Sequence, residues 1–173
     1  TTAAPYENLD AWIDAHFDEE VRFLQELVRV PTDTPPGNNA PHAERTAELL
    51  QGFGFVAERH AVPAPVVEQA GLQTITNLVV RRRFGDDDGN GRTIALNAHG
   101  DVVPPGEGWT HPPYGAEIAD GKLYGRAAAV SKCDFATFTF ATRALEALGA
   151  PLKGGVELYF RSEEHTSELQ SHH

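Results

Sequence analysis

The amino-acid sequence predicts an α/β fold with a mixed sheet, and two patterns carry this prediction. In some segments apolar residues recur at three- and four-residue steps, which is typical of amphipathic helices. Other segments are short, rich in β-branched or aromatic residues, and bounded by Gly, Pro or Asp, as strands are. Because the two kinds of segment are interspersed along the chain, we expect helices packed on a sheet.

Helices are predicted over 7–30, 41–51 and 131–148. The first has one apolar stripe, formed by Leu9, Ile13, Phe17, Val21, Leu24 and Val28. The second begins at Pro41, which fits a first helical turn. The third ends at Gly149, and its expected apolar face consists of Phe135, Phe138, Ala141, Leu145 and Leu148.

Strands are predicted over 55–62, 76–83, 92–100 and 154–160. Asp-Gly and Asn-Gly pairs between the second and third strands predict a hairpin turn. The segment 101–125 is rich in Gly and Pro, and a loop of this length inside a compact domain is typical of a functional site.

The composition narrows the classes of function. The chain has 173 residues, which suits one domain, and a net charge of −11, which argues against binding to nucleic acid or to an anionic membrane. Its apolar runs are shorter than the roughly 18 residues that a membrane span needs. The single cysteine, Cys133, suits a reducing compartment, so we expect a cytoplasmic protein.

The stretch "IALNAHGDVVPPG" carries the sharpest functional signal, because a predicted strand ends there at His99-Gly100-Asp101. On an extended backbone, residues i and i+2 project to the same side. Asp101 therefore reaches the ring nitrogen of His99 that faces away from a metal, and such a contact orients a histidine ligand. The triplet by itself favours a surface His and Asp at a strand end, and the metal-ligand interpretation depends on the surrounding motifs.

The surrounding motifs resemble the M20 family of zinc peptidases and amidohydrolases. A strand ending in His-x-Asp is followed by Val103–Gly106, Trp109 and the hairpin motif Asp120–Arg126, and then by a helix and a strand. The resemblance implies a mixed-sheet, zinc-exopeptidase-like catalytic domain that hydrolyses an amide bond in N-acyl amino acids or small peptides. It also implies one or two zinc ions, with cobalt or manganese as alternatives, and a homodimer as one form of the intact protein.

The same resemblance assigns roles, and the sequence departs from one of them. His99 corresponds to a metal ligand and Asp101 to the carboxylate that orients it. The family's metal-bridging Asp corresponds to Val130, which has no donor atom, whereas Lys132 matches the family's lysine. A homologue that keeps the fold without catalysis is therefore the alternative interpretation. Asp134 is the carboxylate nearest in sequence, and Cys133 is interpreted as a packing residue.

The last residues, 161–173, support two interpretations. Aligned without gaps, Glu164 falls at the family's general-base position and His165 at a metal-ligand position. However, residues 161–172 match the in-frame translation of a common sequencing-adapter oligonucleotide. We therefore interpret 161–173 as a non-native tail and 1–160 as the N-terminal part of an incomplete catalytic domain, inactive by itself.

Overall fold

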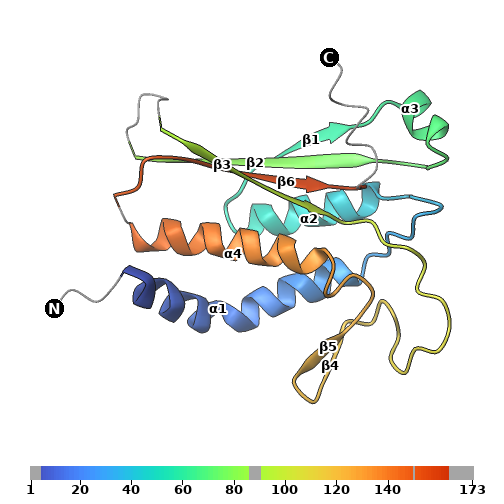
Figure 1. Cartoon of the computed structure of the whole chain (residues 1–173), viewed down its shortest axis with the longest axis horizontal. Helices are drawn as coiled ribbons and strands as arrows, with labels where there is room; N and C mark the ends of the chain where they lie inside the picture. The colour runs from blue at the N-terminus through green and yellow to red at the C-terminus, as the bar shows by residue number, and fades with distance from the viewer. Residues whose placement is uncertain (1–4, 86–90, 150, 164–173) are drawn as a thin grey trace.

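A computed structural model describes residues 5–85, 91–149 and 151–163, and it confirms a mixed α/β fold. The main sheet has the strand order β1-β2-β6-β3. Its strands are β1 (Ala57–Ala61), β2 (Thr76–Phe84), β6 (Gly154–Arg161) and β3 (Thr93–His99). The three long helices lie on one face of this sheet (Figure 1). These are α1 (Pro5–Val28), α2 (Ala40–Gly52) and α4 (Lys132–Leu148).

Two smaller elements complete the described chain. The short helix α3 (Ala64–Gln69), which the sequence patterns did not predict, follows β1. The strands β4 (Glu117–Ala119) and β5 (Lys122–Tyr124) pair antiparallel inside the long loop, where the motif resemblance expects a hairpin. The loop is therefore partly ordered by its own backbone pairing.

The hairpin predicted between the second and third strands is wrong. β6 lies between β2 and β3; it pairs antiparallel with β2 and parallel with β3. The reason is burial: Val156, Leu158 and Phe160 of β6 are all buried, which suits a central position in the sheet. A turn signal reverses the chain, but it does not decide which strands become neighbours. Part of the turn itself, 86–90, lies outside the described residues.

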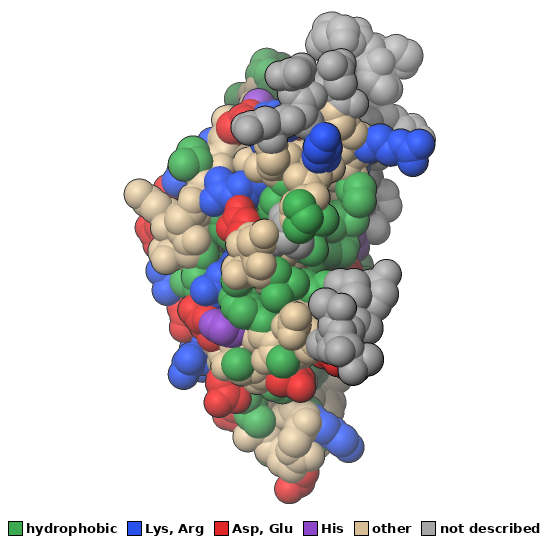
Figure 2. All heavy atoms as spheres, turned by 90° about the vertical axis from the view of Figure 1, so that its left-hand side faces the viewer, with side chains coloured by type: hydrophobic (Ala, Val, Ile, Leu, Met, Phe, Trp, Pro, Cys, Tyr) green, Lys and Arg blue, Asp and Glu red, His purple; other side chains and the backbone are tan. Residues whose placement is uncertain are grey.

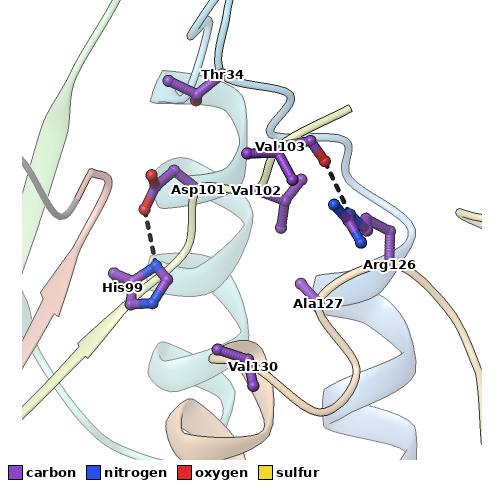
Figure 3. A pocket seen from close by; sticks show the side chains of 8 residues that line it. All are labelled: Thr34, His99, Asp101, Val102, Val103, Arg126, Ala127 and Val130. Carbon is purple, nitrogen blue, oxygen red and sulfur yellow. Dashed lines mark hydrogen bonds and ion pairs between the residues drawn. The ribbon is translucent and has the colours of Figure 1, made fainter. Parts of the chain in front are cut away.

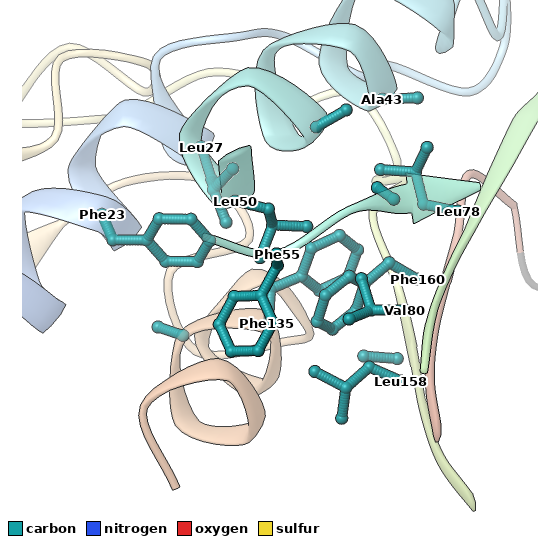
Figure 4. Close-up of a cluster of buried hydrophobic side chains, with 14 of the residues drawn as sticks. Phe23, Leu27, Ala43, Leu50, Phe55, Leu78, Val80, Phe135, Leu158 and Phe160 are labelled. Carbon is teal, nitrogen blue, oxygen red and sulfur yellow. The ribbon is translucent and has the colours of Figure 1, made fainter. Parts of the chain in front are cut away.

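The hydrophobic core lies between the sheet and the helices (Figure 4). Phe135 from α4 stacks on Phe160 from β6, with ring centroids 4.4 Å apart. Leu27 and Leu50 bring α1 and α2 into the same cluster, and both side chains are fully buried. Fully burying a side chain of this size stabilises the fold by roughly 1.5–3 kcal/mol. Since Phe160 pairs with Ala98, next to His99, the core also fixes the strand ends that carry the site.

The predicted helix ranges are confirmed to within about two residues, but the predicted apolar faces are only partly correct. On α1 the side chain of Phe17 is 57% exposed, whereas Phe23 is 2% exposed. The buried face is set by contact with α4, where Phe23 and Phe140 have ring centroids 6.2 Å apart. On α4 the buried face likewise includes Phe140 and excludes Ala141. A one-dimensional pattern cannot choose between adjacent stripes when a helix packs on two neighbours.

Hydrophobic side chains also reach the surface of the molecule. Figure 2 shows them gathered across the middle of the end where α1 begins and α4 ends. Within the described residues, none of the helices has the length and apolar character needed to cross a membrane.

Candidate functional site

The site is built where β3 ends, and the chain there is held from both sides. On one side the N–H of Gly100 donates to the carbonyl of Arg161, 2.8 Å away, which continues the parallel pairing with β6. On the other side the N–H of Val102 donates to Thr32, and the N–H of Thr34 donates to Val102, at 3.1 and 2.7 Å. The loop after α1 therefore clamps residues 100–102 in an extended conformation.

Gly100 is needed because the chain passes close to a buried histidine. A Cβ atom at position 100 would lie 2.8 Å from Cε1 of His42. The ring of His42 is 2% exposed and packs edge-on against Phe135, so it has little room to move. Burial holds the pKa of His42 well below its ordinary value, and the nearby charge of Lys132 acts in the same direction. His42 is thus a neutral packing residue beneath the site.

His99 and Asp101 make the contact that the sequence predicts. Nδ1 of His99 lies 2.8 Å from Oδ1 of Asp101. Because a carboxylate oxygen only accepts hydrogen bonds, this geometry assigns the proton to Nδ1. Asp101 is 7% exposed, so its position is set by the surrounding protein. The pair therefore has a fixed tautomer and ring orientation, with Nε2 as the nitrogen that would coordinate a metal.

The pair lines a cavity of about 330 Å³ (Figure 3). This volume is near the lower end of the range for small-molecule sites, roughly 300–1,000 Å³. Besides His99 and Asp101, the lining consists of Thr34, Val102, Val103, Arg126, Ala127 and Val130. Thr34 and Arg126 were not expected from the sequence as site residues. Arg126 lies within the hairpin motif, but nothing in the sequence places its side chain in this cavity.

A second histidine–carboxylate pair shows why distance alone does not define a site. Nδ1 of His111 lies 2.8 Å from Oε2 of Glu117, the same separation as in the first pair. The Glu117 side chain, however, is 50% exposed, against 8% for Asp101. The ring of His111 stacks on Tyr124 with centroids 3.9 Å apart. Neither His111 nor Glu117 lines the cavity.

A buried lysine lies behind the site. Nζ of Lys132, at the start of α4, donates to the carbonyls of Leu27 and Val30, at 3.1 and 2.9 Å. These carbonyls are at the C-terminal end of α1, where helical backbone leaves acceptors unsatisfied. Burial lowers the pKa of Lys132 to about 7, and the charges of Asp33 and Asp101 oppose that shift. Lys132 therefore joins the end of α1 to the start of α4.

Asp33 links the same loop to the long Gly/Pro-rich segment. The phenol of Tyr114 donates to Oδ1 of Asp33 at 2.5 Å. Burial, together with this hydrogen bond and the charge of Asp33, raises the pKa of Tyr114 above its ordinary value. Since Asp33 lies next to Thr34 and forms a bridge with Val102, this bond fixes one wall of the cavity.

The described part of the chain does not place further candidate metal ligands around His99. Among residues 5–85, 91–149 and 151–163, no group of three or more His, Cys, Asp or Glu is close enough to hold an ion. Val130 is 67% exposed and lines the cavity with a side chain that has no donor atom. Asp134 accepts a hydrogen bond from Ser131 at 2.9 Å, and the thiol of Cys133 donates to Ala129 at 3.1 Å. Neither residue lines the cavity.

The segment 161–173 is described only as far as Glu163. Ser162 is 3% exposed, and its N–H donates to Oδ1 of Asn77 at 2.9 Å. Its carbonyl accepts a hydrogen bond from Nδ2 of Asn39, also at 2.9 Å. Glu164, the predicted general base, lies outside the described residues. Its role and the non-native origin of the segment both stay predictions.

Comparisons with known proteins agree with this fold. The family described as "Peptidase family M20/M25/M40" matches residues 95–171, which include His99, Asp101 and β6. A succinyl-diaminopimelate desuccinylase of Methylobacterium radiotolerans is 36% identical over 149 residues, covering 85% of this chain and 35% of that protein.

Two solved structures have the same arrangement of elements. Human carnosine dipeptidase 1 aligns with a TM-score of 0.71 and 24% identity, over 94% of this chain and 36% of its own. The dipeptidase Dug1p of Saccharomyces cerevisiae aligns with a TM-score of 0.73 and 18% identity, over 95% and 36%. Residues 95–171 match the M20 peptidase family, and the fold is the one that these two dipeptidases share over about a third of their length. The chain spans about a third of the length of these relatives.

Proposed function

We propose that the protein to which this chain belongs is a metal-dependent hydrolase of an amide bond in N-acyl amino acids or small peptides. The observation that carries the proposal is the His99–Asp101 pair, held at 2.8 Å on the wall of a cavity at the end of β3. A carboxylate bound to the far nitrogen of a histidine is the usual support for a metal ligand. The family relatives, which include a desuccinylase, support the same reaction class.

The residues of the described chain fit a metal only in part. His99 supplies one ligand and Asp101 its orientation, whereas a catalytic zinc site needs three protein ligands. The remaining ligands and the general base would come from outside the described residues, among which Glu164 is the candidate that the sequence aligns. A metal held there would polarise the amide carbonyl and lower the pKa of a bound water. Zinc is the proposed ion, with cobalt or manganese as alternatives.

The same proposal extends to the organisation of the protein. We propose that 1–160 is the N-terminal part of a catalytic domain and that a longer protein, in some forms a homodimer, carries the activity. The match to about a third of each relative supports this. The net charge of −11 favours a small substrate over nucleic acid or an anionic membrane surface as the partner. Cys133, a free thiol in the structure, supports the cytoplasm as its location.

One observation favours a second candidate function, a homologue without catalysis. By the motif resemblance Val130 corresponds to the family's bridging carboxylate, and its aliphatic side chain lines the cavity. A protein with this substitution can keep the fold and a ligand cavity while binding no second ion. The two candidates differ in metal content and in turnover.

The test uses protein expressed from the complete reading frame. Bound metal is measured by mass spectrometry, and hydrolysis is measured on N-succinyl and N-acetyl amino acids. His99→Ala should remove bound metal and activity, because it deletes a ligand. Asp101→Asn should weaken metal affinity by about 10–100-fold, which is the usual effect of losing the carboxylate behind a ligand.

His111→Ala is the matched control, since His111 forms an equally short carboxylate pair outside the cavity. It should retain both metal and turnover. Full activity of His99→Ala would refute the ligand assignment. A parent protein with neither metal nor turnover would favour the non-catalytic candidate.

A further inference from the structure

Arg126 is the cavity residue whose role remains to be explained. Its backbone N–H donates to the carbonyl of Pro113 at 2.7 Å. Its side-chain Nε donates to the carbonyl of Val103 at 2.8 Å. Both acceptors belong to the long loop, so main chain and side chain are fixed by the same segment. The remaining guanidinium donors, on the two Nη atoms, are held in a defined plane.

No carboxylate of the described residues forms an ion pair with these Nη donors. Within the described residues, no Asp or Glu lies within ion-pair distance of Arg126, whereas Arg45, Arg59 and Arg81 each form an ion pair. Among the described lining residues Asp101 is the one carboxylate, and it is hydrogen-bonded to His99. Of the lining residues that the structure describes, Arg126 is also the one Lys or Arg. A fixed cation is thus present in the cavity of a chain whose net charge is −11.

Arg126 and His99 place a polar group at each of two opposite ends of the cavity. In Figure 3 Arg126 and the His99–Asp101 pair lie on opposite sides of the cavity, with Val102, Ala127 and Val130 between them. The surface between the two polar ends is therefore aliphatic. It matches a ligand with an anionic group at one end, a short apolar spacer, and a polar group directed at His99.

We propose that Arg126 is a specificity-determining residue that binds a carboxylate of the substrate through its two Nη atoms. The planar guanidinium fork matches a carboxylate in a bidentate arrangement, which a lysine cannot reproduce. The inference rests on the proposed function for the identity of the reacting bond. The binding of a carboxylate can nevertheless be measured without turnover. The carboxylate of the substrate belongs either to its acyl group or to its amino-acid part. Two small ligands, each carrying one of these carboxylates, distinguish the two sources.

The experiment is a titration of the 173-residue chain, followed by ¹⁵N NMR, which also reports whether each variant is folded. Succinamate carries an acyl-side carboxylate, and N-acetylglycine carries an amino-acid carboxylate. Succinamide and N-acetylglycinamide are the neutral controls. One or both carboxylates should shift the Arg126 side-chain and cavity resonances, and the neutral amides should bind at least about tenfold more weakly, because a hydrogen bond to a charged group is lost.

Arg126→Gln should weaken carboxylate binding by at least about tenfold, and Arg126→Lys should restore only part of it. Arg92→Gln, at an exposed position outside the cavity, should bind like the parent chain. Equal binding by a folded Arg126→Gln chain, or equal binding of neutral amides, would overturn the inference, as would no carboxylate binding by the parent. Arg126-dependent binding with no turnover in the complete protein would refute the proposed function and leave this inference standing.

Discussion

At the scale of single residues, burial separates a functional pair from a similar surface pair. His99–Asp101 and His111–Glu117 have the same 2.8 Å separation. If the hydrogen bond between Asp101 and His99 broke, a buried carboxylate would be left without this partner, which costs free energy. Glu117 is half exposed and can exchange its hydrogen bond for water. Only the first pair is therefore rigid enough to orient a ligand.

Val130→Asp tests whether the cavity wall is arranged for a metal. Val130 is 67% exposed and lines the same cavity as His99, so a carboxylate there would add an oxygen ligand. Zinc affinity of the chain, measured by calorimetry, should rise by about tenfold or more, the size of effect that a supporting carboxylate already has. Val103→Asp, also exposed and in the lining, is the control and should have a smaller effect. Equal affinities for the two variants would contradict a metal position near residue 130.

At the scale of elements, the site depends on how α1 and α4 meet. Lys132 is fully buried, and its ammonium group bonds to carbonyls at the end of α1. The sequence gives no hint of this, because a lysine in the first turn of a helix is normally solvated. The loop that follows α1 is hydrogen-bonded to the segment 100–102. The contact of Lys132 with the end of α1 therefore couples the position of α4 to the position of the site.

Lys132→Met should change the dependence of stability on pH. The pKa of Lys132 is about 7 in the folded chain and about 10.4 when unfolded. Between these values the unfolded state binds more protons, so the free energy of unfolding rises with pH, by at most ~1.4 kcal/mol per unit. Urea unfolding at pH 7 and pH 9 should show this rise in the parent and a smaller one in Lys132→Met. Equal slopes would mean that Lys132 titrates normally in the folded chain.

At the scale of the whole molecule, the two edges of the sheet differ. β1 carries Glu58, Arg59 and His60, and charged side chains of this kind discourage edge pairing. Residues 93–98 of β3 carry no charge, and Ile94 is 60% exposed. Among the described strands, none pairs with the outer side of β3. This edge and the apolar end in Figure 2 favour association of the chain.

Ile94→Lys should therefore reduce self-association of the 173-residue chain. A charge on the β3 edge would have to be desolvated when a second strand pairs there. Sedimentation velocity across a range of concentrations should show a larger monomer fraction than for the parent. Val56→Lys adds the same charge before β1, at a position that is 77% exposed, and should have less effect. A similar shift for both variants would attribute the change to net charge and not to the edge.

The sequence predicted the helices, the strands and the His99–Asp101 contact because each depends on neighbours close in the chain. A two-residue spacing on a strand places both side chains on one side, whatever the rest of the fold does. The α/β class follows for a similar reason, since periodicity is a local property. The resemblance to the M20 family, which the comparisons confirm, also rests on short ordered motifs.

Only the tertiary structure decided which elements became neighbours and which polar groups became buried. It placed β6 between β2 and β3, turned Phe17 outward, and buried Lys132 against the end of α1. It also brought Arg126 and Val130 to the cavity that His99 lines. Each of these outcomes depends on contacts between residues far apart in sequence. The free energy that favours these contacts comes from packing and desolvation in the assembled core, and a local sequence pattern contains no information about either.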